Sequence, residues 1–468
     1  MGASVCLPNS SDRGKIVLET NRYWKVPWAV AVALKEYGDI VRVAPNELAF
    51  ITPEAFTDIY DSHTSGYEHF PKTDFMDLGL GDNGLSWEMD PMKHYTDAKK
   101  VAPAFSARSI KAKELTIHKY IDAFIERMRD IGERRDGIEL KTWTDWVAMD
   151  TSADLAYGRE MDHVRHMKST DFLNELWIVD FFVTANQVFK KFPLLSLAKF
   201  LFVPPSILAS YYKVRRINRV AIESRINRRS HPDHLDHFEQ LLSSDADMPT
   251  TKDINHMDVV VGHLVIAGYE PVTSQIFCTL MFSMLESGSL RILVEEIRSE
   301  FKTYEDIQGD SITSLQYLNA SLMETLPITV LSSNGMPRKS PGAMVDGHYV
   351  PKGVIWCLAF TRSRRYFHDP YSYRPQRWLP EDHPHWDPAF KYYARDGFHP
   401  FSLGPRSCPG MPVAWRQTRL FIAKVLWIFD IEMLPNQDIV LERDFKMYGM
   451  WEKPKFWVWF HPRDRDER

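Results

Sequence analysis

The spacing of apolar residues predicts a long helical region in the middle of the chain. From about residue 92 to 330, apolar side chains return every three or four positions, and Gly and Pro are sparse, which is typical of helices that bury one face. One predicted helix runs from Asp253 to Glu286, and a last one runs from Val413 to Ile431. At about 1.5 Å per residue, the first would be roughly 50 Å long and could cross a whole domain.

Strand patterns lie outside this helical region. The stretches 40–43 and 48–51 favour strands, and Pro45 with Asn46 between them indicates a turn. After residue 335, short apolar runs alternate with Pro and Gly as far as Gly410. We therefore expect a mainly α fold with small β-sheets and a long irregular segment before the last helix.

Composition and charge exclude several classes of protein. The 468 residues are 44% hydrophobic and 25% charged, which is ordinary for a globular protein and excludes a largely disordered chain. The formal net charge of -5 lacks the basic excess of a nucleic-acid-binding protein, so no nucleic-acid partner is expected. Four cysteines at positions 6, 278, 357 and 408 are too few and too scattered for a disulfide framework or a zinc site, which favours a reducing compartment.

The amino terminus carries no recognisable targeting segment. No run of about 18 apolar residues occurs, so no transmembrane helix is predicted. The best candidate, Val26 to Leu34, has half of that length, and the ordered regions of a signal peptide are missing. We expect residues 1–36 to form an amino-terminal segment without a transmembrane helix and residues 37–468 to form a single domain.

Residues 172–205 are unusually rich in large apolar side chains, such as Trp177, Phe182 and Phe200. One interpretation is ordinary helix core. The alternative is a substrate lid or a surface that touches a membrane, because a large exposed apolar patch marks an interaction site.

The stretch from Phe401 to Gly410 carries the strongest chemical signal. Cys408 lies just before a predicted helix, where backbone N–H groups and the helix dipole favour a thiolate. A thiolate is a soft donor suited to iron. Gly404 lets the backbone approach a flat ligand, and Arg406 can pair with a carboxylate on that ligand. A lone cysteine is by default a buried structural residue, but the neighbouring residues favour a metal ligand.

This stretch resembles the haem-binding signature of the cytochrome P450 family, FxxGxRxCxG. The resemblance extends from about residue 37 to 460, and residues 41–48 look like the amino-terminal sheet of fungal members that serve secondary metabolism. It implies a P450 fold, with haem between a long central helix and the cysteine loop. It also implies that Cys408 ligates the iron and that Phe401, Gly404 and Arg406 contact the cofactor. The implied partners are an apolar small-molecule substrate and an NADPH-dependent cytochrome P450 reductase.

The predicted central helix resembles the family's oxygen-activation motif at Ala267–Pro271, with a departure. In the family, small residues leave room for oxygen, and an acid followed by a threonine relays protons, which is general-acid work. Glu270 matches the acid and is the predicted catalytic residue, but Pro271 replaces the threonine. Proline has no hydroxyl and cannot donate to the Ala267 carbonyl. Thr273 lies on a different face of a regular helix, so it is a poor substitute.

A second departure is at Glu324–Pro327, which resembles the family's Glu-x-x-Arg pattern. Glu324 and the downstream Arg377 match, but Pro327 takes the place of the helical arginine. We expect a two-member pair of Glu324 with Arg377. We also expect the helix to end near Leu326, because the residue before a proline disfavours helical geometry.

The third departure is in the segment that holds the haem propionates. His94 matches the family's His-x-x-x-Arg pattern, but Ala98 stands in place of arginine. Lys99 or Lys100 is then the candidate cation, as a point charge without the two-pronged geometry of arginine. The resemblance also implies that Arg338 pairs with a propionate. His94 and Arg338 are therefore predicted cofactor contacts.

Three interpretations of function follow. The leading one is a haem-thiolate monooxygenase that uses NADPH-derived electrons and O2. The second is a P450-fold enzyme with a peroxide-driven, rearranging or dehydrating step, which the loss of the hydroxyl at Pro271 motivates. The third is a catalytically impaired haem-binding or haem-free relative. The expected location is the cytoplasm or the surface of the endoplasmic reticulum membrane, with peripheral membrane contact.

Overall fold

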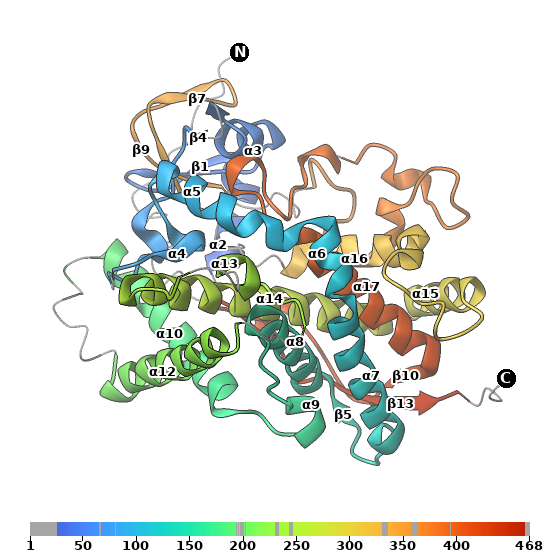
Figure 1. Ribbon diagram of the computed structural model, residues 1–468. Coiled ribbons are helices and arrows are strands. Elements are labelled where there is room, and N and C mark those ends of the chain that lie inside the picture. Colours follow the sequence, from blue (N-terminus) through green and yellow to red (C-terminus); the bar gives the residue numbers. More distant parts are fainter. Residues whose placement is uncertain are drawn as a thin grey trace.

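The structure is a computed structural model in which helices surround one long central helix, and small sheets lie at separate places around the helices (Figure 1). It describes residues 26–64, 67–79, 81–192, 194, 196, 201, 203–229, 234–242, 247–329, 336–357, 364–393 and 395–463.

The described α-helices account for most of the regular structure. They are α2 Val26–Tyr37, α3 Pro53–Tyr60, α4 Gly84–Trp87, α5 Pro91–Val101, α6 Ala107–Ala112, α7 Glu114–Ile131, α8 Leu140–Tyr157, α9 His163–His166, α10 Asp171–Lys191, α12 Pro205–Asn227, α13 Phe238–Leu241, α14 Thr251–Leu285, α15 Ser287–Glu300, α16 Gln316–Thr329, α17 Met411–Ile428 and α18 Leu441–Asp444.

The strands are short and belong to several small sheets. The largest has the order β1-β2-β9-β6, and a three-stranded sheet has the order β10-β13-β5. Their bounds, with those of the three remaining two-stranded pairs, are β1 Ile40–Ala44, β2 Glu47–Phe50, β3 His63–Thr64, β4 Tyr67–Glu68, β5 Ile138–Glu139, β6 Arg338–Ser340, β7 Ala343–Val345, β8 His348–Val350, β9 Gly353–Cys357, β10 Phe429–Met433, β11 Lys446–Met447, β12 Trp451–Glu452 and β13 Trp457–Pro462.

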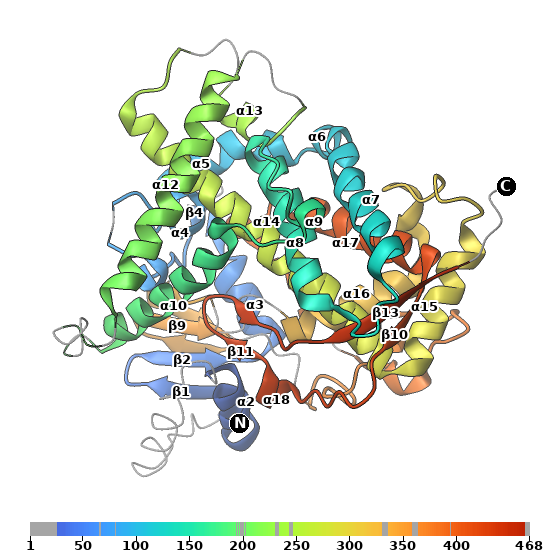
Figure 2. The ribbon, with the colours of Figure 1, turned by 90° about the horizontal axis from the view of Figure 1, so that it is seen from below.

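The central helix α14 packs closely against α8, and the two run side by side in Figures 1 and 2. The Thr250 side chain accepts a hydrogen bond from the backbone N–H of Asp253, and the Asp253 carboxylate accepts one from the Thr250 backbone in return, so α14 begins with a capping box. Gly268 is the point of closest approach, because a Cβ there would lie 2.5 Å from the Ser152 Oγ of α8. That hydroxyl donates to the Val265 carbonyl over 2.7 Å. Contact between the two helices therefore requires a glycine at position 268.

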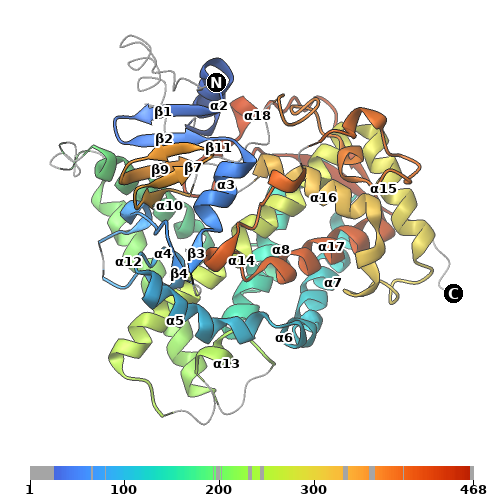
Figure 3. The same cartoon turned by 90° about the horizontal axis from the view of Figure 1, so that it is seen from above.

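The four-stranded sheet and α2 form one side of the molecule (Figure 3). Val30, Ala33 and Leu34 of α2 are buried in a cluster with Val41 and Ala49 of the sheet. Part of the expected amino-terminal segment, from residue 26, is therefore packed on the folded unit. The predicted boundary at residue 36 remains a prediction.

The observed elements confirm the mainly α fold with small sheets. The helix predicted from Asp253 to Glu286 is α14, with shifts of two residues and one at its ends. The last predicted helix corresponds to α17, Met411–Ile428, and Ile431 instead belongs to β10. The chain extends there because β10 pairs with β13, a partner too distant in sequence to be read from local periodicity.

The expectation that a helix ends near Leu326 is wrong. Helix α16 includes Pro327 and ends two residues later, at Thr329. Proline removes one backbone donor, but this loss falls in the last turn of the helix. Side-chain contacts of the preceding turn remain, such as the 3.0 Å hydrogen bond between the hydroxyls of Thr279 and Thr325.

Candidate functional site

The Cys408 loop holds its sulfur at the start of α17. The Cys408 backbone N–H donates to the Phe401 carbonyl over 2.8 Å, which closes the loop. The N–H groups of Gly410 and Met411 donate to the thiol. Desolvation raises the pKa of the Cys408 thiol above its ordinary value, while these two donors act in the opposite direction. Cys408 is exposed, so its sulfur is within reach of a ligand.

Gly404 is required by the protein around it. Its φ is +64°, and a Cβ would lie 2.4 Å from the Tyr60 carbonyl oxygen at the end of α3. We expected this glycine to admit a flat ligand, but the structure shows that its missing side chain makes room for α3. Phe401 packs its ring 5.9 Å from that of Trp415. Contact of Phe401 and Gly404 with the cofactor remains a prediction.

Two arginines predicted to hold the cofactor come together beside this loop. Both oxygens of Glu68 accept from Arg406, at 2.7 and 2.6 Å, and one of them also accepts from Arg338 at 3.0 Å. Arg338 is 2% exposed and its Nε has no partner among the described residues. Desolvation alone would raise the pKa of Glu68, but hydrogen bonds and charges from the two arginines lower it below its ordinary value.

A lysine that the sequence analysis missed completes this cluster. Lys72 forms an isolated antiparallel bridge with Arg338, and residues paired across strands project to the same face. Burial, together with the positive charges of Arg338 and Arg406, lowers the pKa of Lys72 to about 7. His94 of α5 is buried beside them, and desolvation, the Arg406 charge and the Lys72 charge lower its pKa to about 3. His94 is therefore neutral near pH 7.

The substitution at Ala98 is not repaired by its neighbours in sequence. Lys99 and Lys100 are exposed on α5, and Lys100 lies 3.7 Å from the carboxylate of Asp97. The expectation that one of them supplies the missing cation is therefore not supported by the structure. Successive residues of a helix point about 100° apart, so Lys99 and Lys100 point away from the face of α5 that carries His94. No spacing rule links Lys72 to Arg338, since only the bridge between their strands brings them together.

The charges of this cluster fit a haem. We define the propionate cradle as Lys72, Arg338, Arg406, Glu68 and His94. With Lys72 protonated, its three cations and single carboxylate leave two positive charges, which equals the negative charge of two propionates. Buried positive charge without a counter-ion is energetically costly, so this excess favours an anionic ligand. The Arg338 Nε, which has no partner among the described residues, is a further hydrogen-bond donor for such a ligand. The accessible Cys408 sulfur lies on the loop that also carries Arg406. These residues fit an iron porphyrin with an axial thiolate.

Glu270 lies apart from the propionate cradle, in the core between α14 and the β12 strand. It is fully buried, and its Oε1 accepts from Ser274 Oγ at 2.9 Å and from the Trp451 N–H at 3.2 Å. Its Oε2 is buried without a hydrogen-bond partner among the described residues. Desolvation raises the pKa of Glu270 above its ordinary value, against the lowering influence of the Lys453 charge. The predicted catalytic role of Glu270 remains a prediction.

The small residues of the oxygen-activation motif do not share one role. Ala267 is exposed although α14 is mostly buried around it, which marks open space beside this face of the helix. Gly268 instead faces Ser152 of α8, so it does not make room for oxygen as expected. Thr273 is fully buried and donates to the Asp145 carboxylate over 2.8 Å. The direction of the Thr273 side chain agrees with the expectation that Thr273 is a poor substitute for the hydroxyl missing at position 271.

The pair of Glu324 and Arg377 forms without the helical arginine. Arg377 Nε lies 2.8 Å from Glu324 Oε2. The same carboxylate accepts from Trp378 Nε1 at 2.7 Å and from the Arg374 backbone at 2.9 Å. Desolvation raises the pKa of Glu324 to about 7, in opposition to the Arg377 charge. One buried acid on α16 therefore holds three residues of a single short stretch, 374–378, of the irregular segment.

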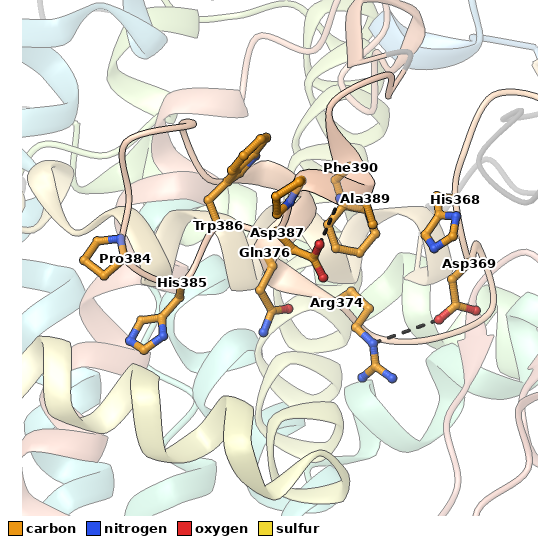
Figure 4. Close-up of a pocket in the computed structure, with 11 residues that line it drawn as sticks. His368, Asp369, Arg374, Gln376, Pro384, His385, Trp386, Asp387, Ala389 and Phe390 are labelled. Atoms are coloured by element: carbon orange, nitrogen blue, oxygen red, sulfur yellow. Dashed lines mark hydrogen bonds and ion pairs between the residues drawn. The ribbon is translucent and has the colours of Figure 1, made fainter.

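A separate pocket of about 540 Å³ lies in this irregular segment (Figure 4). Arg374 and Asp369 lie at one side of it, and His385 lies at the other. None of the residues that line it belongs to the Cys408 loop or to α14. The pocket is therefore distinct from the proposed haem site.

The apolar segment around α10 divides between core and surface. Phe172 and Leu176 are buried, whereas Leu194 and Leu201 are 86% and 83% exposed. Phe200 lies outside the described residues. Within the described part of the chain, no single helix has the length and apolarity needed to cross a bilayer, although the sharply bent pair of α14 and residues 288–300 passes that test together.

The whole sequence is similar to known proteins of one family. The sequence profile described as Cytochrome P450 matches residues 16–459. The cytochrome P450 monooxygenase TwmD of Talaromyces wortmannii is 45% identical over 442 residues, which cover 93% of this chain and 86% of that protein. The cytochrome P450 monooxygenase BOA3 of Botryotinia fuckeliana is 32% identical, over 91% of this chain and 84% of that protein. The chain therefore belongs to the cytochrome P450 family.

Proposed function

We propose that this P450 monooxygenase oxidises an apolar small molecule in fungal secondary metabolism. The observation that carries the proposal is the accessible Cys408 sulfur, hydrogen-bonded by two N–H groups at the start of α17 and located on the same loop as Arg406 of the propionate cradle. The relatives TwmD and BOA3 support it, since both are named cytochrome P450 monooxygenases.

The haem-thiolate cofactor supplies an iron centre at which oxygen can be activated. In our proposal Cys408 holds the iron. Arg338, Arg406 and Lys72 neutralise the two propionates, and neutral His94 offers a hydrogen bond rather than a charge. Two of these side chains are held in place by other parts of the fold: Arg406 by Glu68, and Lys72 by the Ser86 carbonyl at 2.6 Å.

The face of α14 that carries Ala267 supports an apolar substrate. Leu264 and Pro271, at three residues before and four after Ala267, lie on the same face. All three are partly or largely accessible. None of their side chains can hydrogen-bond to a substrate, so this face selects by shape and apolar contact.

An NADPH–cytochrome P450 reductase is the proposed electron donor, and peripheral membrane contact is proposed for the exposed apolar residues Leu194 and Leu201. Exposed leucines gain free energy when a bilayer surface removes them from water.

A second candidate function is a step that needs no ordinary oxygen activation, such as a peroxide-driven, rearranging or dehydrating reaction. The observation that favours it is Pro271, which leaves the residue after the acid without a hydroxyl. A residue without a hydroxyl could not deliver a proton from that position, which favours a reaction that does not depend on proton delivery there.

The first experiment tests the ligand of the iron. Purified protein is reduced and exposed to carbon monoxide, and its absorption is compared with that of Cys408→Ser. We expect the long-wavelength band of a thiolate-bound haem in the parent protein and its loss in the variant. Cys278→Ala is the matched control, because Cys278 is buried in α14 and should leave the band in place. An unchanged band in Cys408→Ser would refute the assignment.

The second experiment separates the two candidate functions. The protein is supplied with reductase, NADPH and candidate substrates, and products are counted against NADPH consumed. Matching amounts support the monooxygenase. Product that forms without NADPH or without oxygen supports the second candidate.

A further inference from the structure

Position 271 lacks a hydroxyl, but α14 carries another one on the same face. Seven residues make almost two full turns, so Ser274 lies within about 20° of the direction of Ala267 around the helix axis. Thr273 points about 120° away. Ser274, and not Thr273, therefore lies in line with Ala267 along α14, two turns further on, where the helix is buried.

Ser274 and Glu270 already form an acid–alcohol pair. Ser274 Oγ donates to Glu270 Oε1 over 2.9 Å, and the Trp451 N–H of β12 donates to the same oxygen. The second oxygen, Oε2, is buried and has no partner among the described residues. A buried polar atom without a partner is costly, so Oε2 is suited to pass a proton to a bound molecule or water.

Behind Ser274 lies a buried lysine. Lys453 Nζ lies 3.5 Å from Ser274 Oγ and 3.0 Å from Asp145 Oδ1, and its side chain is 0% exposed. The ammonium group can only donate, so Ser274 accepts from Lys453 while it donates to Glu270. The hydrogen bonds thus point in one direction, from the lysine toward the acid.

The other end of this network approaches the protein surface. Asp145 Oδ2 accepts from Lys141 Nζ at 3.1 Å, and the Lys141 side chain is 22% exposed. Lys141 and Asp145 both lie on α8, one turn apart. Because α8 packs on α14, the network extends from the partly exposed Lys141 to the buried face of the central helix. Asp180 is a second acid near Glu270, and its Oδ2 accepts from the Met450 N–H at 3.2 Å.

We propose that Ser274 and Glu270 replace the acid–alcohol pair that Pro271 removes, and that Lys453 and Asp145 supply protons to this pair from the surface at Lys141. The proposal rests on the monooxygenase function proposed above. For each proton that leaves at Glu270 Oε2, Ser274 passes one to Glu270, Lys453 passes one to Ser274, and Lys141 restores Lys453 through Asp145. One proton enters from solvent, so the charges of the relay are unchanged and no electron moves.

The direct test removes the alcohol. In the haem-loaded enzyme with reductase, Ser274→Ala should lower the product formed per NADPH by about tenfold or more, since general-acid catalysis contributes at least that much, and should raise peroxide release. Ser274→Thr keeps a hydroxyl and should retain most of the coupling. Ser283→Ala is the matched control, because Ser283 is a buried serine of the same helix that contacts Tyr373 instead. Equal coupling in Ser274→Ala and Ser283→Ala would overturn the proposal.

A second variant tests the buried ion pair. Changing Lys453 alone would leave Asp145 as a buried charge with one partner fewer, so the variant combines Lys453→Met with Asp145→Asn. It should lose coupling to the same degree as Ser274→Ala, and its thermal unfolding identifies a variant that fails to fold. A folded double variant with the coupling of the parent protein would overturn the role of Lys453 and Asp145.

A spectroscopic readout does not depend on turnover. The infrared band that disappears in Glu270→Gln identifies the Glu270 carboxyl group in the resting protein, whether it absorbs as a carbonyl or as a carboxylate. Ser274→Ala should shift this band, because it removes a hydrogen bond to Oε1, and Ser283→Ala should leave it unchanged. An unshifted band in Ser274→Ala would show that the pair does not form. If the parent protein lacks the carbon monoxide band, the proposed function fails; if the band is present but these variants are silent, only the relay fails.

Discussion

At the scale of single residues, the proposed propionate cradle uses side chains that differ from the family's usual set. Lys72 is partly buried and bridges to the buried Arg338, whereas Lys99 and Lys100 are exposed on α5. Lys72, which bridges to Arg338 of β6, can neutralise a propionate as an arginine on α5 would. Charge neutralisation depends on the distance between the charges and not on the element that carries the cation. The lysine gives a point charge and not a planar fork.

Lys72→Met should weaken haem retention. The variant keeps the length of the side chain but removes one of three cations, so one propionate loses its charge partner. We expect haem transfer to an acceptor protein to be faster by about tenfold, which corresponds to about 1.4 kcal/mol. Lys99→Met is the control, since Lys99 is exposed on α5. Identical transfer rates in the two variants would contradict the role of Lys72.

Gly404→Ala should destabilise the cysteine loop. The residue has a positive φ, and a Cβ would lie 2.4 Å from the Tyr60 carbonyl, so the variant suffers both backbone strain and overpacking, about 2–4 kcal/mol together. Gly347→Ala isolates the strain, because Gly347 also has a positive φ of +71° but nothing within 4 Å of its Cβ position. Thermal unfolding of both variants measures the difference. Equal losses would show that contact with α3 is unimportant.

At the scale of elements, the junction between α16 and the irregular segment relies on one buried acid. Arg377 is 1% exposed, and its guanidinium also donates to the carbonyls of His368, Asp369 and Ser372. Glu324 supplies the negative charge that this arrangement needs. The helical arginine of the family's pattern is absent, because Pro327 takes its place. Backbone carbonyls therefore accept several of the hydrogen bonds that orient the Arg377 guanidinium.

At a pH well above 7, where Glu324 is ionised, Glu324→Gln should destabilise the protein by about 3–5 kcal/mol, because it leaves the buried Arg377 charge without its counter-ion. The exposed pair of Arg291 and Glu295, 63% and 58% exposed, gives the control. Glu295→Gln should cost less than about 1 kcal/mol, since exposed ion pairs contribute little. Denaturant unfolding of the haem-loaded protein measures both. A loss in Glu324→Gln no larger than in Glu295→Gln would contradict the anchoring role.

At the scale of the whole molecule, buried histidines tie stability to pH. His237 stacks on Phe105 with ring centroids 4.7 Å apart, and its Nδ1 accepts from Lys113 Nζ at 2.8 Å. Desolvation and the Lys113 charge lower the pKa of His237 to about 3. The unfolded chain binds a proton to this histidine below its ordinary pKa of 6.5, whereas the folded chain does not until about pH 3. Stability from this group is therefore full above pH 6.5 and falls as the pH drops toward 3.

His237→Gln should remove this dependence. Between pH 7 and pH 5, the parent protein should lose about 2 kcal/mol of unfolding free energy more than the variant does. His166→Gln is the control, because His166 is exposed on α9 and should leave the parent's pH dependence unchanged. Denaturant unfolding at the two pH values measures the free energies. Parallel losses in parent and His237→Gln would contradict the assignment.

Local sequence patterns determined the helices, the first two strands and the cysteine loop. Each of these features depends on residues that are contiguous or one helical turn apart, so periodicity and motif spacing carry the information. Cys408, Arg406 and Gly404 lie within five positions of one another, and the apolar periodicity of α14 extends over its whole length. The pairing of Glu324 with Arg377 was also predictable, although the continuation of α16 through Pro327 was not.

Only the tertiary structure decided which side chains meet across the chain. Lys72 joins Arg338 through a bridge between residues 266 positions apart, and Lys453 reaches Ser274 across 179 positions. Such contacts depend on how strands pair and helices cross, and no local preference encodes them. The sequence by itself therefore determined that this protein holds a haem through a cysteine. The packing of α8, α14 and the carboxyl-terminal strands decided how charge and protons are arranged around it, because buried polar groups must find partners wherever the fold places them.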